Sequence, residues 1–137
     1  LDRGSPRQSS VAPKNSTPKL FVTYTKKNAQ TGKVYSGRAS GPATMTPKEI
    51  VEKRDGKHHM DAEGYGPAVL DEASFNKDAI RGREQMLIDH HGGSQWSGGD
   101  SGNKINGISS LNPNKDKYMK AAEKEFGALP PKKRAAQ

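Results

Sequence analysis

The chain contains no cysteine, which excludes a disulfide framework and a thiolate metal site. Long apolar runs are also missing. No stretch approaches the roughly 20 residues needed to cross a bilayer, and nothing near Leu1 resembles a signal peptide. Large apolar residues are scarce, because Leu, Ile, Val and Phe make up only 19 of the 137 residues. This composition excludes a large hydrophobic core built from Leu, Ile, Val and Phe. Any fold must therefore also bury Ala, Met and Tyr side chains and satisfy its buried polar groups with hydrogen bonds.

The net charge of +8 is unevenly distributed. Residues 1–19 carry four basic side chains against one acidic, and 128–137 carry three basic side chains. The body, 20–127, has 16 basic and 14 acidic residues, so most of the excess lies in the two ends. Within the body, 20–60 hold eight basic and three acidic residues, whereas 61–76 hold four acidic and no basic ones. A basic surface that meets phosphate must therefore come mainly from 20–60.

The first half of the body predicts a β-hairpin followed by a helix. The β-branched and aromatic run 20–25 is a typical strand, 33–36 is a shorter one, and the residues between them suit a hairpin loop. Thr46-Pro47-Lys48-Glu49 is typical of a helix start, because Thr can cap, Pro fits the first turn and Glu completes a capping box. This helix is expected over 47–55, with Gly56 ending it. Residues 67–70 are a candidate third strand.

The second half predicts two helices joined by a glycine-serine loop. The first helix spans 77–91 and ends at Gly92-Gly93, and the second spans about 114–126 and ends at Gly127. The order of elements indicates an α+β fold, with a small antiparallel sheet that opens with a β-hairpin and is flanked by about three helices. We expect a flexible lead-in over 1–19, one domain over 20–127 and a basic flexible tail over 128–137. The chain resembles a fragment or processed product of a longer protein.

Two groups of residues in the first half could carry chemistry. Tyr24 and Tyr35 lie on neighbouring predicted strands, where pairing could bring their hydroxyls together, although such tyrosines usually serve packing. Arg54 is followed by His58 and His59, just beyond a predicted helix. Arginine offers phosphate a fixed fork of donors, and histidine can exchange a proton near neutral pH. The alternative for this second group is a solvated helix end.

A third feature lies in the helix predicted for 77–91. Glu84 falls beside the apolar stripe, where a carboxylate is costly unless it is paired, near the surface or bound to a cation. Gly82 is unfavourable inside a helix, which indicates the close approach of another backbone or a substrate. The alternative is a partly exposed, ion-paired Glu84. His90 and His91 point to different sides of a helix, and the zinc spacings are missing, so neither a zinc site nor a histidine-metal nuclease site is favoured.

Together these residues resemble the GIY-YIG (URI-type) nuclease domain, in the form found at the C-terminal ends of bacterial Rhs and contact-dependent polymorphic toxins. Val22-Thr23-Tyr24 stands where the family has Gly-Ile-Tyr on a strand, and Tyr35-Ser36-Gly37 stands where it has Tyr-Ile-Gly. Further positions resemble the family's helix arginine and nearby histidine, its metal-binding glutamate and its downstream asparagine. They are Arg54 with His58, Glu84, and either Asn103 or Asn106. Arg38 is an alternative to Arg54 for the role of the family's arginine.

The resemblance implies a metal-dependent endonuclease toxin that hydrolyses phosphodiester bonds. Glu84 would hold one divalent cation, Mg²⁺ being favoured. Tyr24 would deprotonate or orient the attacking water, assisted by Tyr35 or His58, while Arg54 would neutralise charge on the transition state. The expected substrate-binding positions are Gly37, Arg38, Asn103 and Asn106. As a base, Tyr24 would need a lowered pKa.

The resemblance also implies a biological setting. DNA is the favoured substrate, with RNA possible. The implied partner is a cognate immunity protein, and the protein is expected to be a monomer. It would be a secreted or delivered effector fragment that acts in the cytoplasm of a target bacterium.

Two other functions remain open on the sequence alone. One is a metal-independent ribonuclease toxin that uses His58 or His59 with Arg54, and EDTA would distinguish it from the metal-dependent enzyme. The other is a small basic nucleic-acid-binding module without catalysis, which would bind in a salt-dependent way and leave plasmid intact. The binding module gives no reason for Glu84 beside an apolar stripe.

Overall fold

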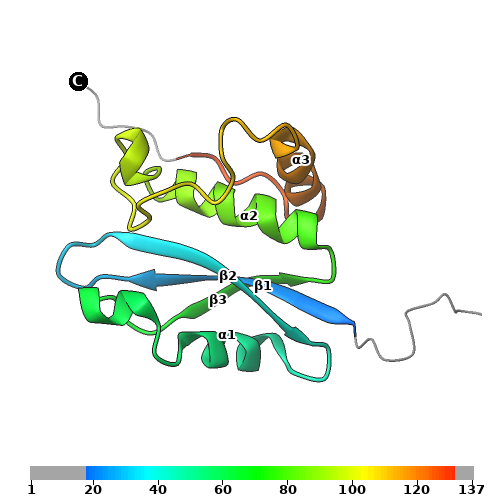
Figure 1. Cartoon of the computed structure of the whole chain (residues 1–137), viewed down its shortest axis with the longest axis horizontal. Helices are drawn as coiled ribbons and strands as arrows, with labels where there is room; N and C mark the ends of the chain where they lie inside the picture. Colours follow the sequence, from blue (N-terminus) through cyan, green and yellow to red (C-terminus); the bar gives the residue numbers. More distant parts are fainter. Residues whose placement is uncertain (1–17, 132–137) are drawn as a thin grey trace, which may run out of the picture.

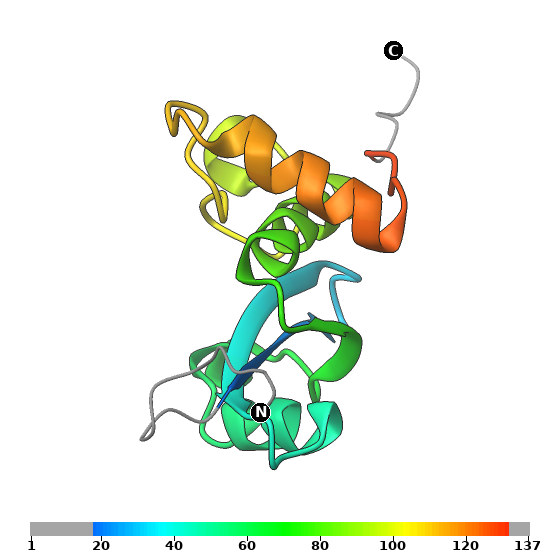
Figure 2. The same cartoon turned by 90° about the vertical axis from the view of Figure 1, so that its right-hand side faces the viewer.

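The computed structural model describes residues 18–131 and has the predicted α+β architecture. A three-stranded antiparallel sheet of order β2-β1-β3 lies between helical layers (Figure 1). Helix α1 covers one face of the sheet and α2 the other, and α3 packs on the far side of α2 (Figure 2). The predicted lead-in and tail lie largely outside the described residues. Within the part described, no helix combines the length and apolar character needed to cross a membrane.

The hairpin is longer than predicted, because β1 spans Lys19–Lys27 and β2 spans Val34–Pro42. The second half of β2 contains Gly, Ser and Pro, which have low strand propensity. It is nevertheless extended because it pairs with β1 along its whole length. The register places Tyr24 opposite Gly37 and Tyr35 opposite Lys26, so the tyrosines are diagonal neighbours on one face rather than a direct pair.

The predicted capping box of the first helix is confirmed. Helix α1 spans Pro47–Asp55, and Thr46 Oγ1 accepts a hydrogen bond from the Glu49 backbone N–H (3.1 Å). The Thr46 backbone N–H donates in turn to Glu49 Oε1 (2.8 Å). A short 3₁₀ helix, η1, follows at His59–Glu63. Capping satisfies N–H groups that the helix itself cannot pair, which explains why the helix begins where the sequence predicts.

The third strand lies further along the chain than expected. β3 spans Val69–Ser74 rather than 67–70, and it pairs antiparallel to β1 with a register shift between Thr23 and Tyr24. Pro67 has no backbone N–H to contribute to a ladder. The strand is instead defined by its pairing with β1, which local propensity does not encode.

The two predicted late helices are confirmed, and their packing explains Gly82. Helix α2 spans Lys77–His90 and α3 spans Lys115–Phe126, with a one-turn 3₁₀ helix, η2, at Gln95–Ser97 between them. A Cβ on Gly82 would overlap the carbonyl of Tyr118 in α3. The close backbone that Gly82 indicated is therefore α3.

The core is small and depends on the residue types that the composition predicts. Between the sheet and α1 it consists of Leu20, Val22, Tyr24, Ile50 and Val51. Met, Ala and Tyr side chains fill other buried positions together with polar groups that hydrogen-bond, including Met60, Tyr65, Ala79, Gln85, Met86, Asn103 and Ala122.

A buried lysine fixes α1 and η1 to the sheet. Lys26 on β1 is fully buried, and its Nζ donates to Asp55 at the end of α1 and to Asp61 of η1 (2.7 Å). Burial alone would lower the pKa of Lys26, but the hydrogen bonds and the negative charges of the two carboxylates together outweigh burial and raise the pKa. The ion pairs therefore hold the segment that carries Arg54 and His59 against β1.

Candidate functional site

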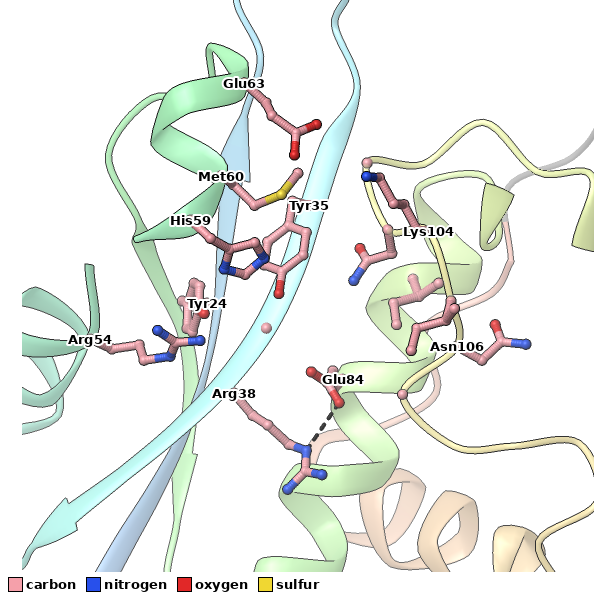
Figure 3. Close-up of a pocket in the computed structure, with 16 residues that line it drawn as sticks. Tyr24, Tyr35, Arg38, Arg54, His59, Met60, Glu63, Glu84, Lys104 and Asn106 are labelled. Atoms are coloured by element: carbon pink, nitrogen blue, oxygen red, sulfur yellow. Dashed lines mark hydrogen bonds and ion pairs between the residues drawn. The ribbon is translucent and has the colours of Figure 1, made fainter. Parts of the chain in front are cut away.

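A pocket of about 690 Å³ lies beside β2, one of the two edge strands of the sheet. One wall comes from the hairpin, the end of α1 and η1, and the other comes from α2 and the loop 102–107 (Figure 3). Eight of the nine predicted site residues line it: Tyr24, Tyr35, Gly37, Arg38, Arg54, Glu84, Asn103 and Asn106. The ninth, His58, does not line the pocket but hydrogen-bonds to Tyr24, which does. Tyr24 and Gly107, which are 83 positions apart in the chain, thus line the same pocket.

Gly37 explains how a tyrosine from the central strand reaches the edge of the sheet. Tyr24 is on β1 and only 1% exposed, yet it lines the pocket. A Cβ on Gly37 would lie 2.5 Å from both Cζ and Oη of Tyr24. The missing side chain at this position on β2 therefore leaves the space through which the phenol reaches the pocket.

His58 is a supporting residue for Tyr24. Its Nδ1 accepts a hydrogen bond from the Met60 backbone N–H (3.1 Å), so in the neutral ring the proton is on Nε2. Nε2 therefore donates to Tyr24 Oη (2.8 Å). Burial lowers the pKa of His58 to about 4, with further lowering by Arg54 and Lys26. The ring is neutral at pH 7, and both of its nitrogens are used within the protein.

The pocket keeps both phenols protonated. Burial raises the pKa of Tyr24 well above its ordinary value, and the neighbouring Tyr35 raises it further, while Arg54 opposes the shift. The pKa of Tyr35 is also raised, by burial and by Glu84. The lowered pKa that a tyrosine base would need is therefore not provided by these side chains.

Glu84 is the buried carboxylate of the pocket. Its Oε1 accepts a hydrogen bond from Arg38 Nε (3.1 Å), while within residues 18–131 its Oε2 has no hydrogen-bond donor. Burial raises the pKa of Glu84 and the charge of Arg38 opposes that rise. Gly107 makes room for the carboxylate, because a Cβ there would overlap Oε1. This environment leaves one carboxylate oxygen available to a ligand.

Arg38 and Arg54, the two candidates for the catalytic arginine, both line the pocket but differ in the contacts that they make. Arg38 is engaged with Glu84. Arg54 is exposed, and among the described residues it makes no hydrogen bond or ion pair. The guanidinium of Arg54 is therefore free to bind an anion.

The two rival asparagines hold the loop in place. Asn103 Oδ1 accepts from the Ser36 backbone N–H and Nδ2 donates to the Ser36 carbonyl, both at 2.8 Å. Asn106 Oδ1 accepts from Gln85 Nε2 (3.1 Å). Asn103 thus pairs with the outer edge of β2 as a neighbouring strand would, and both the oxygen and the nitrogen of its amide are engaged in this contact.

Three further polar side chains, those of His59, Glu63 and Lys104, line the pocket. His59 stacks on His58 at a ring-centroid distance of 4.5 Å and meets Tyr35 edge-on at 5.7 Å. Glu63 and Lys104 were not predicted, although Lys104 adjoins a predicted asparagine. Trp96, which is 87% exposed, is next to the wall because its backbone N–H donates to the Lys104 carbonyl (2.9 Å). For Glu63 the sequence offers no signal beyond its position near the histidines.

No cluster of three or more His, Asp or Glu side chains suited to a metal exists within 18–131. Glu84 is the buried acidic group with a free oxygen. A single carboxylate is a common protein contribution to Mg²⁺ binding, since this ion retains waters and uses substrate phosphates as further ligands. The donor set therefore fits a loosely held hard cation and not a tightly caged zinc.

Comparisons of the chain with models of known protein families, with curated proteins and with solved structures gave no match. The functional argument therefore proceeds from the geometry of the pocket.

Proposed function

We propose that the protein is a metal-dependent endonuclease that hydrolyses phosphodiester bonds, with DNA as the favoured substrate. The observation that carries this proposal is the meeting of Tyr24, Tyr35 and Glu84 with two arginines in one pocket at the sheet edge. This set of groups suits phosphodiester hydrolysis, because guanidinium groups and a carboxylate-held cation can stabilise the negative charge that develops on phosphate oxygens in the transition state, and a phenol can donate a hydrogen bond.

The cationic side chains would position the scissile phosphate. Arg54 has a free guanidinium, and Lys104 is exposed on the opposite wall (Figure 3). A planar guanidinium can bind two phosphate oxygens at once, whereas lysine acts as a point charge. Arg54 therefore stabilises the developing negative charge, and Lys104 attracts the phosphate into the pocket.

Glu84 would hold the divalent cation through Oε2. When bound, the ion supplies charge stabilisation at the phosphate and at the leaving oxygen. Arg38 keeps the Glu84 carboxylate oriented and favours its ionised form, in opposition to burial. Arg38 is thus a positioning residue for Glu84, and Arg54 is the arginine that meets the substrate.

Tyr24 would act as a neutral phenol that orients the attacking water. Its raised pKa argues against a phenolate base. Because Tyr24 Oη already accepts a hydrogen bond from His58 Nε2, its own proton is available to donate into the pocket. His59, whose ring makes no hydrogen bond among the described residues, is the imidazole placed to accept the proton of the attacking water.

The test is cleavage of supercoiled plasmid by the wild type and by Glu84→Gln, with Mg²⁺ and with EDTA. We expect the wild type to cleave only with Mg²⁺. The variant should lose at least about 100-fold in rate, the scale reported for removing one key electrostatic group, while it unfolds at the wild-type temperature. Glu123→Gln, an exposed position on α3, is the matched control. A Glu84→Gln protein that cleaves at the wild-type rate would exclude the metal role.

One observation favours a second candidate function. His59 and Arg54 line the same pocket without ion pairs among residues 18–131, as a metal-independent ribonuclease would need. His58 is less suited to this chemistry, because both of its nitrogens are engaged. Cleavage of total RNA that persists in EDTA and is lost in His59→Gln would favour this alternative.

The use of this activity in interbacterial competition, with a cognate immunity protein as partner, rests on the resemblance of the motifs to polymorphic toxin domains. It is tested by expressing the protein in the cytoplasm of a bacterium. We expect chromosome degradation and growth arrest with the wild type and normal growth with Glu84→Gln at equal protein levels. Arrest by both proteins would contradict a nuclease mechanism of toxicity.

A further inference from the structure

Two more hollows lie beside the second half of β2, on its two sides, and each shares an arginine with the pocket. The first, of about 260 Å³, is on the α2 side, is lined by Lys19, Lys77 and Arg38, and has no acidic residue. The second, of about 410 Å³, is on the α1 side, is lined by Lys53 and Arg54, and also has none. We call Lys19, Lys53 and Lys77 together the edge lysines.

The edge lysines are available to a ligand. All three are exposed, and none makes an ion pair or side-chain hydrogen bond within residues 18–131. By contrast, Lys26 and Arg83 are committed to carboxylates. Cations that are free and gathered beside two hollows are the arrangement that a polyanion recognises.

The backbone of β2 adds donors to the same edge. Ser36 has its N–H and carbonyl turned outward, where they bond Asn103. Because outward groups alternate along an antiparallel strand, the N–H groups of Arg38 and Ser40 also face away from β1. The loop that contains Asn103 covers only the first part of β2 and leaves this part of the edge uncovered (Figure 1).

The opposite edge of the sheet lacks free cations of this kind. Strand β3 carries Asp71 and Glu72 and no basic residue, and both carboxylates are paired with Arg83, at 2.8 and 3.9 Å. The β3 edge therefore offers a polyanion no lysine or arginine of its own strand, whereas lysines that make no ion pair within residues 18–131 lie beside β2. This difference in charge favours the β2 side for a polyanion.

We propose that the edge lysines bind phosphates flanking the scissile one, so that the substrate is a polynucleotide lying along β2 rather than a short nucleotide confined to the pocket. This inference rests on the proposed function. From Tyr35 to Pro42 the edge is about 23 Å long at ~3.3 Å per residue. That length equals roughly seven base-pair steps at ~3.4 Å each.

Binding of a fluorescent 20-base-pair duplex in EDTA, measured over a range of salt concentrations, tests the contacts directly. We compare the wild type with Lys19→Gln/Lys77→Gln and with the matched control Lys120→Gln/Lys124→Gln, which removes two exposed lysines from α3. Each lost phosphate contact should reduce the slope of log K against log salt by about 0.9. We expect the edge variant to lose about 1.8 in slope and the control to lose none; equal slopes in all three proteins would overturn the proposal.

Cleavage then separates this inference from the proposed function. On the duplex with Mg²⁺, the edge variant should show KM raised about tenfold with kcat retained, and on a dinucleotide it should match the wild type. Lys53→Gln should behave in the same way. Equal losses on both substrates would mean that the lysines serve the reacting phosphate, which overturns the inference. If the edge variant loses slope in the salt titration but the wild type cleaves no substrate, the proposed nuclease activity is refuted. The inference that the edge lysines bind phosphates would still stand.

Discussion

Substitution of Gly37 by alanine tests whether the position of Tyr24 decides activity. The new Cβ would lie 2.5 Å from Cζ and Oη of Tyr24. Ordinary carbon contacts are about 3.5–4.0 Å, so the ring must move by about 1 Å. The hydrogen bond of 2.8 Å from His58 to Tyr24 Oη would then lengthen or break.

Two effects of different size follow from this displacement. Overpacking of a buried site costs about 1–3 kcal/mol of unfolding free energy. A displacement of about 1 Å in a reacting group lowers the rate on the order of 100-fold. We therefore expect Gly37→Ala to remain folded, with a lower denaturation midpoint, and to lose most of its activity.

The assay pairs urea denaturation with the plasmid cleavage rate at saturating Mg²⁺. Gly66→Ala is the control, because its Cβ would meet nothing closer than 3.5 Å. Tyr24→Phe keeps the ring and removes the oxygen, so it reports on the hydroxyl even if Gly37→Ala fails to fold. Cleavage at the wild-type rate by both Gly37→Ala and Tyr24→Phe would refute the reasoning.

Two further predictions concern the residues that support the pocket. Asn103→Ala should lower the unfolding free energy by roughly 2–3 kcal/mol, because it leaves the N–H and carbonyl of Ser36 buried without partners; urea denaturation measures this, and a loss under 0.5 kcal/mol would contradict it. His58 should show no NMR titration between pH 5 and 8, since its pKa is about 4. The unfolded chain binds a proton there near pH 6.5 and the folded chain does not, so stability should fall as the pH drops from 6.5 towards 4, by on the order of 3 kcal/mol. A His58→Gln variant should lack this slope, and a resonance that titrates near pH 6.5 would contradict the assignment.

Local chemistry explains which parts of the fold the sequence predicts well. The start of α1 follows from Thr46 and Glu49, whose capping contacts involve residues only three apart. The end of α3 at Gly127 follows from its positive φ of 85°. In contrast, the extent of β2 and the position of β3 depend on pairing with β1. Such pairing joins residues far apart in the chain, so propensity cannot define it.

The candidate site likewise combines features that the sequence predicts with features that depend on long-range contacts. Residue type and element placement identify Tyr24, Tyr35 and Glu84 as candidates, and the structure brings them into one pocket. What a side chain does there depends on partners that the sequence does not display. Asn103 is occupied by a β2 backbone 67 positions away, and His58 is held by Met60 and Tyr24. These contacts distinguish residues facing a ligand from those that hold the pocket together.

The placement of Trp96 gives the protein a built-in optical reporter. It is the only tryptophan in the chain, so all indole emission comes from one ring. That ring is exposed to solvent and is tied through its backbone to Lys104 on the pocket wall. We expect a nucleic acid that enters beside Lys104 to change the polarity or the collisional quenching around the indole. Unlabelled protein can therefore be titrated by fluorescence, and the arrival of a ligand followed in real time in a stopped-flow instrument.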